Sequence, residues 1–137
     1  MDRIEFCNLL VRAKEQSGKS TNTVSFDLRM QWSTLRRFEK GANNSNMKKV
    51  FEYMAVIDSC LHIVSDNSDK TILNYDDLIS WITKERNGKY TQRQIAKIIN
   101  ISYVMIANIE SRKNSLTIDV FLRIIDALGY TVKIERI

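Results

Sequence analysis

The stretch "YTQRQIAKIINISYVMIANIESRK", residues 90–113, is rich in isoleucine but breaks its helical rhythm near Asn100. Before the break, apolar residues recur at the spacing of one helix face, and a second stripe of this kind starts after it. Thr91 and Ser102 are residue types that cap helix N-termini, and each stands just before one of the two stretches. The pattern therefore predicts two short helices joined by a turn of only a few residues.

Two residues fit the needs of such a tight turn. Helices that cross steeply over a short connection need a small residue at their contact, and Ala96 occupies that position. The turn itself needs a residue that accepts positive φ, and Asn100 is of a type that does so. Ile101 is expected to enter the core directly afterwards. We interpret residues 90–113 as a helix-turn-helix unit.

Residues 90–130 resemble the lambda-repressor/Cro-like, or XRE-type, helix-turn-helix family. The positions that carry the resemblance are Gln92, Ala96, Asn100, Ile101, Ser102, Ile106, Ile109, Glu110 and "IDVFLRIIDALGY" at residues 118–130. The family often has glycine where this chain has Asn100. The resemblance implies a small helical domain whose second motif helix lies in the major groove of DNA.

The first half of the chain matches the second at a constant offset of 71 residues, without a gap from about residue 21 to 65. In the motif, Val24, Ser25, Leu28, Met30, Leu35 and Phe38 align with Ile95, Ala96, Ile99, Ile101, Ile106 and Ile109. In the next helix, Met47, Val50, Phe51, Met54 and Ile57 align with Ile118, Phe121, Leu122, Ile125 and Leu128. The predicted fold is therefore mostly α, a tandem repeat of two lambda-repressor-like domains.

The predicted domains are residues 1–66 and 67–137. Each begins with a helix, over residues 2–16 and 75–87, and the polar segment 66–74 is expected to link the domains.

Three differences between the copies stand out at the matched turn, helix start and helix end. Arg29 stands in place of Asn100, and an arginine at positive φ costs about 1 kcal/mol, so the first turn is expected to deviate from the family geometry. The other two differences are Thr21 for Gln92 and Asp58 for Gly129.

Each copy ends in an alternating segment, "CLHIVS" at residues 60–65 and "TVKIER" at residues 131–136. Alternation of this kind predicts a short strand with one buried face. A lone strand is unstable, so we expect the two strands to pair antiparallel within the chain as a pseudo-dimer. The alternative, pairing across a true homodimer, stays open.

The resemblance directs attention to the exposed side of the second motif helix in each copy. In the first copy, arginines can bind guanine in a bidentate manner, and the polar residues can reach phosphates or base edges. The alternative is an ordinary solvated face, but an exposed tryptophan beside two arginines favours DNA. The candidate residues here are Gln31, Trp32, Ser33, Thr34, Arg36, Arg37 and Lys40.

The second copy offers a less polar face. Asn108 is suited to reading adenine, Val104 to contacting thymine methyl groups, and the basic residues to holding phosphates. The alternative is a contact with another protein through Tyr103, Val104 and Met105. The candidate DNA-binding residues are Gln92, Ser102, Tyr103, Val104, Asn108, Arg112 and Lys113.

Composition narrows the function. The chain has 137 residues, a net charge of +5 and no proline, which permits a polyanionic partner and favours helices. His62 is the only histidine, and no phosphate-binding loop or paired carboxylates occur, so we expect no enzyme, no cofactor and no metal site. No apolar run is long enough for a membrane span, and a cytoplasmic location is expected.

The resulting hypothesis is a sequence-specific transcription regulator. It would bind double-stranded DNA at an imperfect palindrome, with two recognition helices in successive major grooves. The alternative is a protein-interaction module, antitoxin-like or an adaptor, in which one or both helix-turn-helix units have lost DNA binding.

Overall fold

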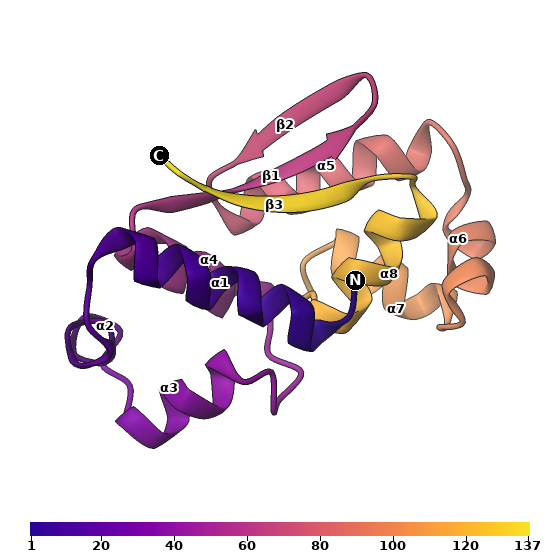
Figure 1. The fold of residues 1–137 in the computed structure, drawn as a ribbon. Coiled ribbons are helices and arrows are strands. Elements are labelled where there is room, and N and C mark those ends of the chain that lie inside the picture. The colour runs from indigo at the N-terminus through magenta and orange to yellow at the C-terminus, as the bar shows by residue number, and fades with distance from the viewer.

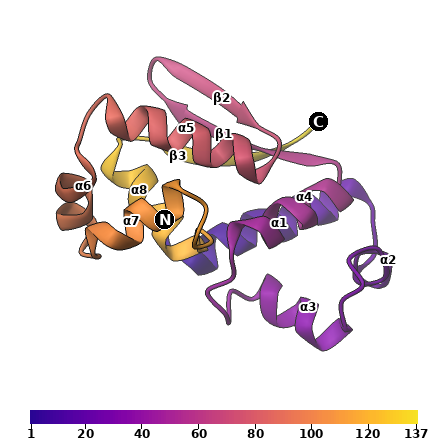
Figure 2. The same cartoon turned by 180° about the vertical axis from the view of Figure 1, so that it is seen from behind.

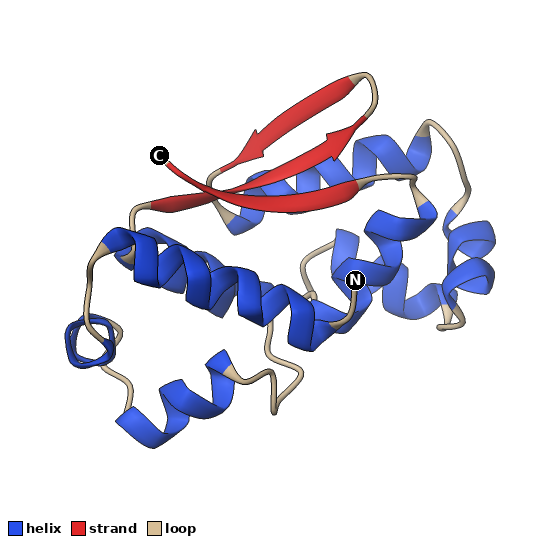
Figure 3. Cartoon of the chain, viewed as in Figure 1, coloured by secondary structure: helices blue, strands red, loops and turns tan.

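The computed structural model describes all 137 residues and is mostly helical, with one three-stranded antiparallel sheet (Figures 1 and 3). In chain order the elements are α1 (Arg3–Ser17), α2 (Thr21–Asp27), α3 (Trp32–Glu39), α4 (Met47–Val56), β1 (Ser59–Ser65), β2 (Ser68–Ile72), α5 (Tyr75–Asn87), α6 (Gln92–Ile99), α7 (Tyr103–Glu110), α8 (Ile118–Ala127) and β3 (Thr131–Arg136). Helices α1–α4 thus precede β1, and helices α5–α8 lie between β2 and β3. None of the helices is both long and apolar enough to cross a membrane.

The predicted helix-turn-helix over residues 90–113 is confirmed as α6, a turn and α7. The Thr91 side chain accepts a hydrogen bond from the Gln94 amide in a reciprocal capping box, and the Ser102 side chain accepts one from the Met105 amide. Asn100 ends α6 in the left-handed conformation with φ 59°. The inward residues of both helices are buried, while Ile101 is only partly buried against the core.

Left-handed residues recur at matched positions of the two halves. The Arg29 turn adopts the same left-handed conformation as the Asn100 turn, so the expected deviation at Arg29 is not seen. Because this conformation strains a residue that carries a Cβ atom, its recurrence at matched positions indicates that the two halves have similar turns. The pairs are Arg29 and Asn100 (φ 52° and 59°), Gly41 and Arg112 (70° and 67°), and Asp58 and Gly129 (54° and 85°).

The sheet joins the ends of the two halves. β1 is its central strand, with β3 antiparallel on one side and β2 antiparallel on the other. Leu61 lies opposite Ile134 and Ile63 opposite Val132, which puts the apolar residues of both strands on the core side. The antiparallel pairing expected between the two terminal strands is thus present within one chain.

The segment 66–74 differs from the linker expected from its polar start. Asp66 and Asn67 form a hairpin turn, and Ser68–Ile72 returns along β1 as β2. Ile72, at the end of this strand, is only 1% exposed. Burial of this one residue, together with pairing along β1, gives the polar segment a defined structure.

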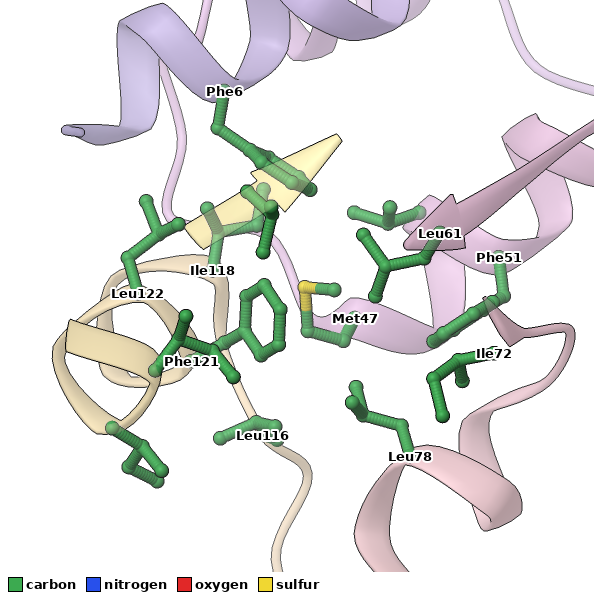
Figure 4. Packing of buried hydrophobic residues seen from close by; sticks show 14 of the residues in the cluster. Phe6, Met47, Phe51, Leu61, Ile72, Leu78, Leu116, Ile118, Phe121 and Leu122 are labelled. Carbon is green, nitrogen blue, oxygen red and sulfur yellow. The ribbon is translucent and has the colours of Figure 1, made fainter. Parts of the chain in front are cut away.

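A single core unites both halves of the chain. Its 32 buried residues come from α1 through β3, and Figure 4 shows Met47 and Leu61 packed towards Phe121 and Leu78. Phe6 of α1 meets Phe121 of α8 edge to face, with ring centroids 6.0 Å apart. The halves 1–66 and 67–137 therefore do not have separate cores.

A pair of main-chain hydrogen bonds crosses the boundary between the halves. The Met47 amide donates to the Leu116 carbonyl at 2.7 Å, and the Ile118 amide donates to the Ser45 carbonyl at 2.9 Å. The two bonds are equivalent at the offset of 71 residues, since Ile118 is the counterpart of Met47 and Leu116 is the counterpart of Ser45. Between them lies an antiparallel bridge that joins Asn46 to Thr117, again 71 residues apart.

Candidate nucleic-acid interface

A buried ion pair holds the C-terminal end of α7. The Arg86 guanidinium of α5 donates two hydrogen bonds to the Glu110 carboxylate, Nη2 to Oε1 at 2.6 Å and Nε to Oε2 at 2.9 Å. Both side chains are only 9% exposed. The Gln92 side chain of α6 also donates to Glu110 Oε1, at 3.0 Å. Since breaking a buried pair of this kind is costly, α7 is fixed against α5 and α6 with its opposite side free.

The end of α3 is held in a similar way. Lys14 Nζ of α1 donates to Glu39 Oε2 at 2.6 Å, and both side chains are buried. The Tyr53 hydroxyl donates to the same oxygen at 2.7 Å, and Lys14 also donates to Thr21 Oγ1 at 3.0 Å. Burial and the bond to Glu39 raise the pKa of Tyr53 above its ordinary value. Each motif helix thus ends on a buried glutamate that is paired with a cation from the first helix of its half.

The free side of α3 carries the predicted DNA-binding residues of the first half. The Trp32 side chain is 52% exposed, and the Arg36 guanidinium lies 5.3 Å from the centre of its ring. Arg37 Nη2 donates to Asn43 Oδ1 at 3.3 Å. All seven candidates are exposed on α3 or beside it: Gln31, Trp32, Ser33, Thr34, Arg36, Arg37 and Lys40.

The free side of α7 is more apolar. The side chains of Tyr103, Val104 and Met105 are exposed, while Asn108 is partly buried. The Arg93 guanidinium of α6 lies 4.0 Å from the centre of the Tyr103 ring. Arg93 was not among the predicted residues. Its place one residue after Gln92, near the start of α6, was the only sequence signal for it.

A helix-turn-helix family model matches residues 83–134. This range starts inside α5 and continues through α6, α7 and α8 into β3, so it contains the whole α6–α7 motif. The match shows that this segment is similar to helix-turn-helix domains, which in known regulators bind DNA. It does not extend into the first half and is not evidence of a second copy. No curated protein and no solved structure matches the chain.

Within the helix-turn-helix segment, two candidate DNA contacts are engaged inside the protein. The Gln92 amide is directed to Glu110, as described above. Arg112 turns back to α5, where Nη2 donates to Ser80 Oγ at 3.1 Å and Nε donates to Asp76 Oδ1 at 3.3 Å. Ser102 and Lys113 are exposed. Phosphate binding by Gln92 or Arg112 therefore stays a prediction, and it would compete with these bonds.

The motif helices lie far from the sheet. Figures 1 and 2 show α1 and α4 between the sheet and α3, and α8 between the sheet and α7, while α5 runs along the sheet. The sheet side carries the single histidine. His62 Nδ1 lies 2.8 Å from Asp69 Oδ1, and the structure contains no group of three or more histidine, cysteine or acidic side chains in a metal-binding arrangement.

Proposed function

We propose that the protein is a transcription regulator that places α3 and α7 in successive major grooves of double-stranded DNA. In this proposal residues 1–66 and 67–137 are two copies of one helix-turn-helix domain and act as the two subunits of a repressor dimer. The family match supports DNA binding by the second half. Support for the first half comes from its equivalence to the second.

One observation carries the proposal: two residues lie opposite their own counterparts. His62 is paired with Lys133 in the β1–β3 register, and Asn46 is bridged to Thr117. In both pairs the residue numbers differ by 71. A residue faces its own counterpart only where a twofold axis passes between the two, as in an isologous dimer interface. Two such points, one in the sheet and one between the helical parts, are what a fused dimer predicts.

A twofold axis through these points supports simultaneous DNA contact by both halves. In this proposal the axis relates α3 to α7, and both helices then present their free sides in the same direction along it. In helix-turn-helix dimers the two recognition helices enter grooves about 34 Å apart along B-form DNA. The net charge of +5 favours a polyanion, and each neutralised phosphate contributes about −0.9 to the slope of log affinity against log salt.

The proposal is tested by selecting binding sites from random duplex DNA with the purified protein and then measuring affinity by fluorescence anisotropy. The double variant R36A/R37A should bind the selected site at least about fivefold more weakly, because one bidentate arginine–guanine contact is worth about 1–3 kcal/mol. The control K70A/K133A removes the same charge from exposed positions on the sheet and should bind nearly normally. Equal affinities for the two double variants would contradict a reading role for α3.

A second candidate function, a protein-interaction module, is favoured by one feature. Several large apolar side chains are exposed on the motif helices, among them Phe26 at 83%, Ile98 at 54% and Val104 at 49%. Exposed apolar surface is typical of contacts with other proteins. Failure to select any DNA sequence, with the protein folded, would favour this candidate over DNA binding.

A further inference from the structure

Matched positions on the two motif helices carry different chemistry. The free side of α3 presents hydroxyl and guanidinium groups, whereas the free side of α7 presents mostly apolar groups. Val104 and Met105 are 49% and 39% exposed, so these apolar side chains are available to a partner. At an offset of 71 the pairs are Ser33 and Val104, Thr34 and Met105, Arg36 and Ala107, and Arg37 and Asn108.

The arginines that stack on the leading aromatic residues also differ. Trp32 and Tyr103 are counterparts at the first position of α3 and α7. Arg36, which stacks on Trp32, belongs to α3 itself, one turn along the reading helix. Arg93, which stacks on Tyr103, belongs to the supporting helix α6, and its counterpart in the first half is Asn22. An arginine is therefore part of the reading face only in the first half.

We propose that α3 and α7 read chemically different half-sites, guanine-bearing under α3 and thymine-rich under α7. The chain then binds its operator in one orientation only. This inference depends on the proposed function, since it specifies which bases the two helices would recognise.

The chemistry of the major groove supports this division. Guanine presents two acceptors there, N7 and O6, which match the paired donors of an arginine such as Arg36 or Arg37. Thymine presents a C5-methyl group, and apolar side chains such as Val104 and Met105 gain from covering it. Arg93, at the edge of the α7 face, is suited to a phosphate rather than a base. An arginine beside a small apolar face suits DNA better than it suits an apolar protein surface.

Orientation follows from the covalent fusion. A homodimer carries two identical reading helices, so exchanging its half-sites changes nothing. Here α3 and α7 differ and cannot exchange places without turning the whole chain around. A site with the two half-sites of unlike composition would therefore fix which end of the protein faces which flank of the DNA.

Base analogues placed in one selected operator test whether α3 reads guanine and α7 reads thymine. Deoxyuridine in place of thymidine removes only the C5-methyl group, and 7-deazaguanine removes only the N7 acceptor. Uracil placed in the α7 half-site should weaken binding roughly fourfold for each contacted methyl group and have little effect in the other half. Deazaguanine should weaken binding roughly fivefold to tenfold in the α3 half-site alone.

A matched variant identifies the half-site that α7 contacts. V104S/M105T gives α7 the residues that α3 carries at these positions, and both side chains are exposed. The variant should lose its sensitivity to uracil in one half-site and keep its sensitivity to deazaguanine in the other. Circular dichroism of the variant, unchanged from that of the parent, verifies folding.

Two outcomes would overturn the inference in distinguishable ways. If the protein binds a selected site but uracil has the same effect in both half-sites, or V104S/M105T binds and responds as the parent does, the division of chemistry is wrong while DNA binding stands. If no duplex is bound at all, the proposed function fails together with the inference.

Discussion

Replacing Lys14 by methionine should destabilise the protein strongly, because it leaves the Glu39 carboxylate buried without its cation. The two groups are 2.6 Å apart, and their side chains are only 7% and 4% exposed. Loss of one partner from a buried pair costs about 3–5 kcal/mol. A domain of ordinary stability has about 5–15 kcal/mol in total, so K14M should lose a large part of its free energy of unfolding.

A second substitution separates the buried charge from other effects of the change. In K14M/E39Q, the amide oxygen of glutamine can still accept the hydrogen bond from the Tyr53 hydroxyl, but no charge is left buried. The double variant should therefore recover at least about 2 kcal/mol of the loss, since a neutral hydrogen-bonded group is much cheaper to bury than an unpaired ion. R12M removes an exposed charge from the same helix and should change stability by no more than about 0.5 kcal/mol.

Urea unfolding followed by circular dichroism measures all four proteins, with linear extrapolation to water. The reasoning would be refuted if K14M lost less than about 1 kcal/mol, or if K14M/E39Q were less stable than K14M. Either result would mean that Glu39 is not an ion that depends on Lys14 in the folded protein. The ion pair would then not be what fixes the end of α3.

Two further predictions concern the shared core and the thiols. F121A should lower the free energy of unfolding by about 3–5 kcal/mol, because Phe121 is fully buried in the core that unites the two halves. The variant should still unfold in a single transition by circular dichroism and tryptophan fluorescence. Two separated transitions would contradict the shared core. Burial raises the pKa of the Cys7 thiol from its ordinary value of 9.0 to about 11, so between these pH values the unfolded chain releases a proton that the native protein keeps. Cys7 should therefore not affect the free energy of unfolding below pH 9, and should lower it by an amount of order 2 kcal/mol as pH rises towards 11. The C7A variant should lose less stability over this pH range. Equal losses in C7A and the parent would refute the raised pKa of Cys7.

The local structure of the motif could be predicted from the sequence because its determinants are close together in the chain. Thr91 and Ser102 cap the helices to which they belong, and Asn100 takes the left-handed conformation that the turn needs. The antiparallel pairing of β1 with β3 was also expected from the alternation within each segment, whereas their register is known only from the structure. The conformation of Arg29 was not predicted correctly, because the strain of an arginine at positive φ was expected to change the turn, whereas the turn keeps the left-handed conformation.

Features that depend on distant residues were not predictable in the same way. β2 begins with polar residues, and its pairing with β1 depends on a hairpin turn and on the burial of Ile72 in a core formed by both halves. Arg112 was expected to contact DNA, but its side chain reaches Asp76 and Ser80 on a helix more than 30 residues earlier. No sequence pattern near Arg112 indicates a contact with Asp76 or Ser80. Pairing of Arg93 with Tyr103 likewise depends on how α6 crosses α7.

The number of chains on one operator, and the extent of DNA that they protect, tests the central claim most directly. Light scattering of the purified complex gives the stoichiometry, and hydroxyl-radical footprinting gives the protected positions. We predict one chain for each operator, with protection in two patches centred about one helical turn, 10–10.5 base pairs, apart. A complex in which one chain protects a single patch, or in which two chains are needed for two patches, would contradict the claim that one polypeptide supplies both recognition helices.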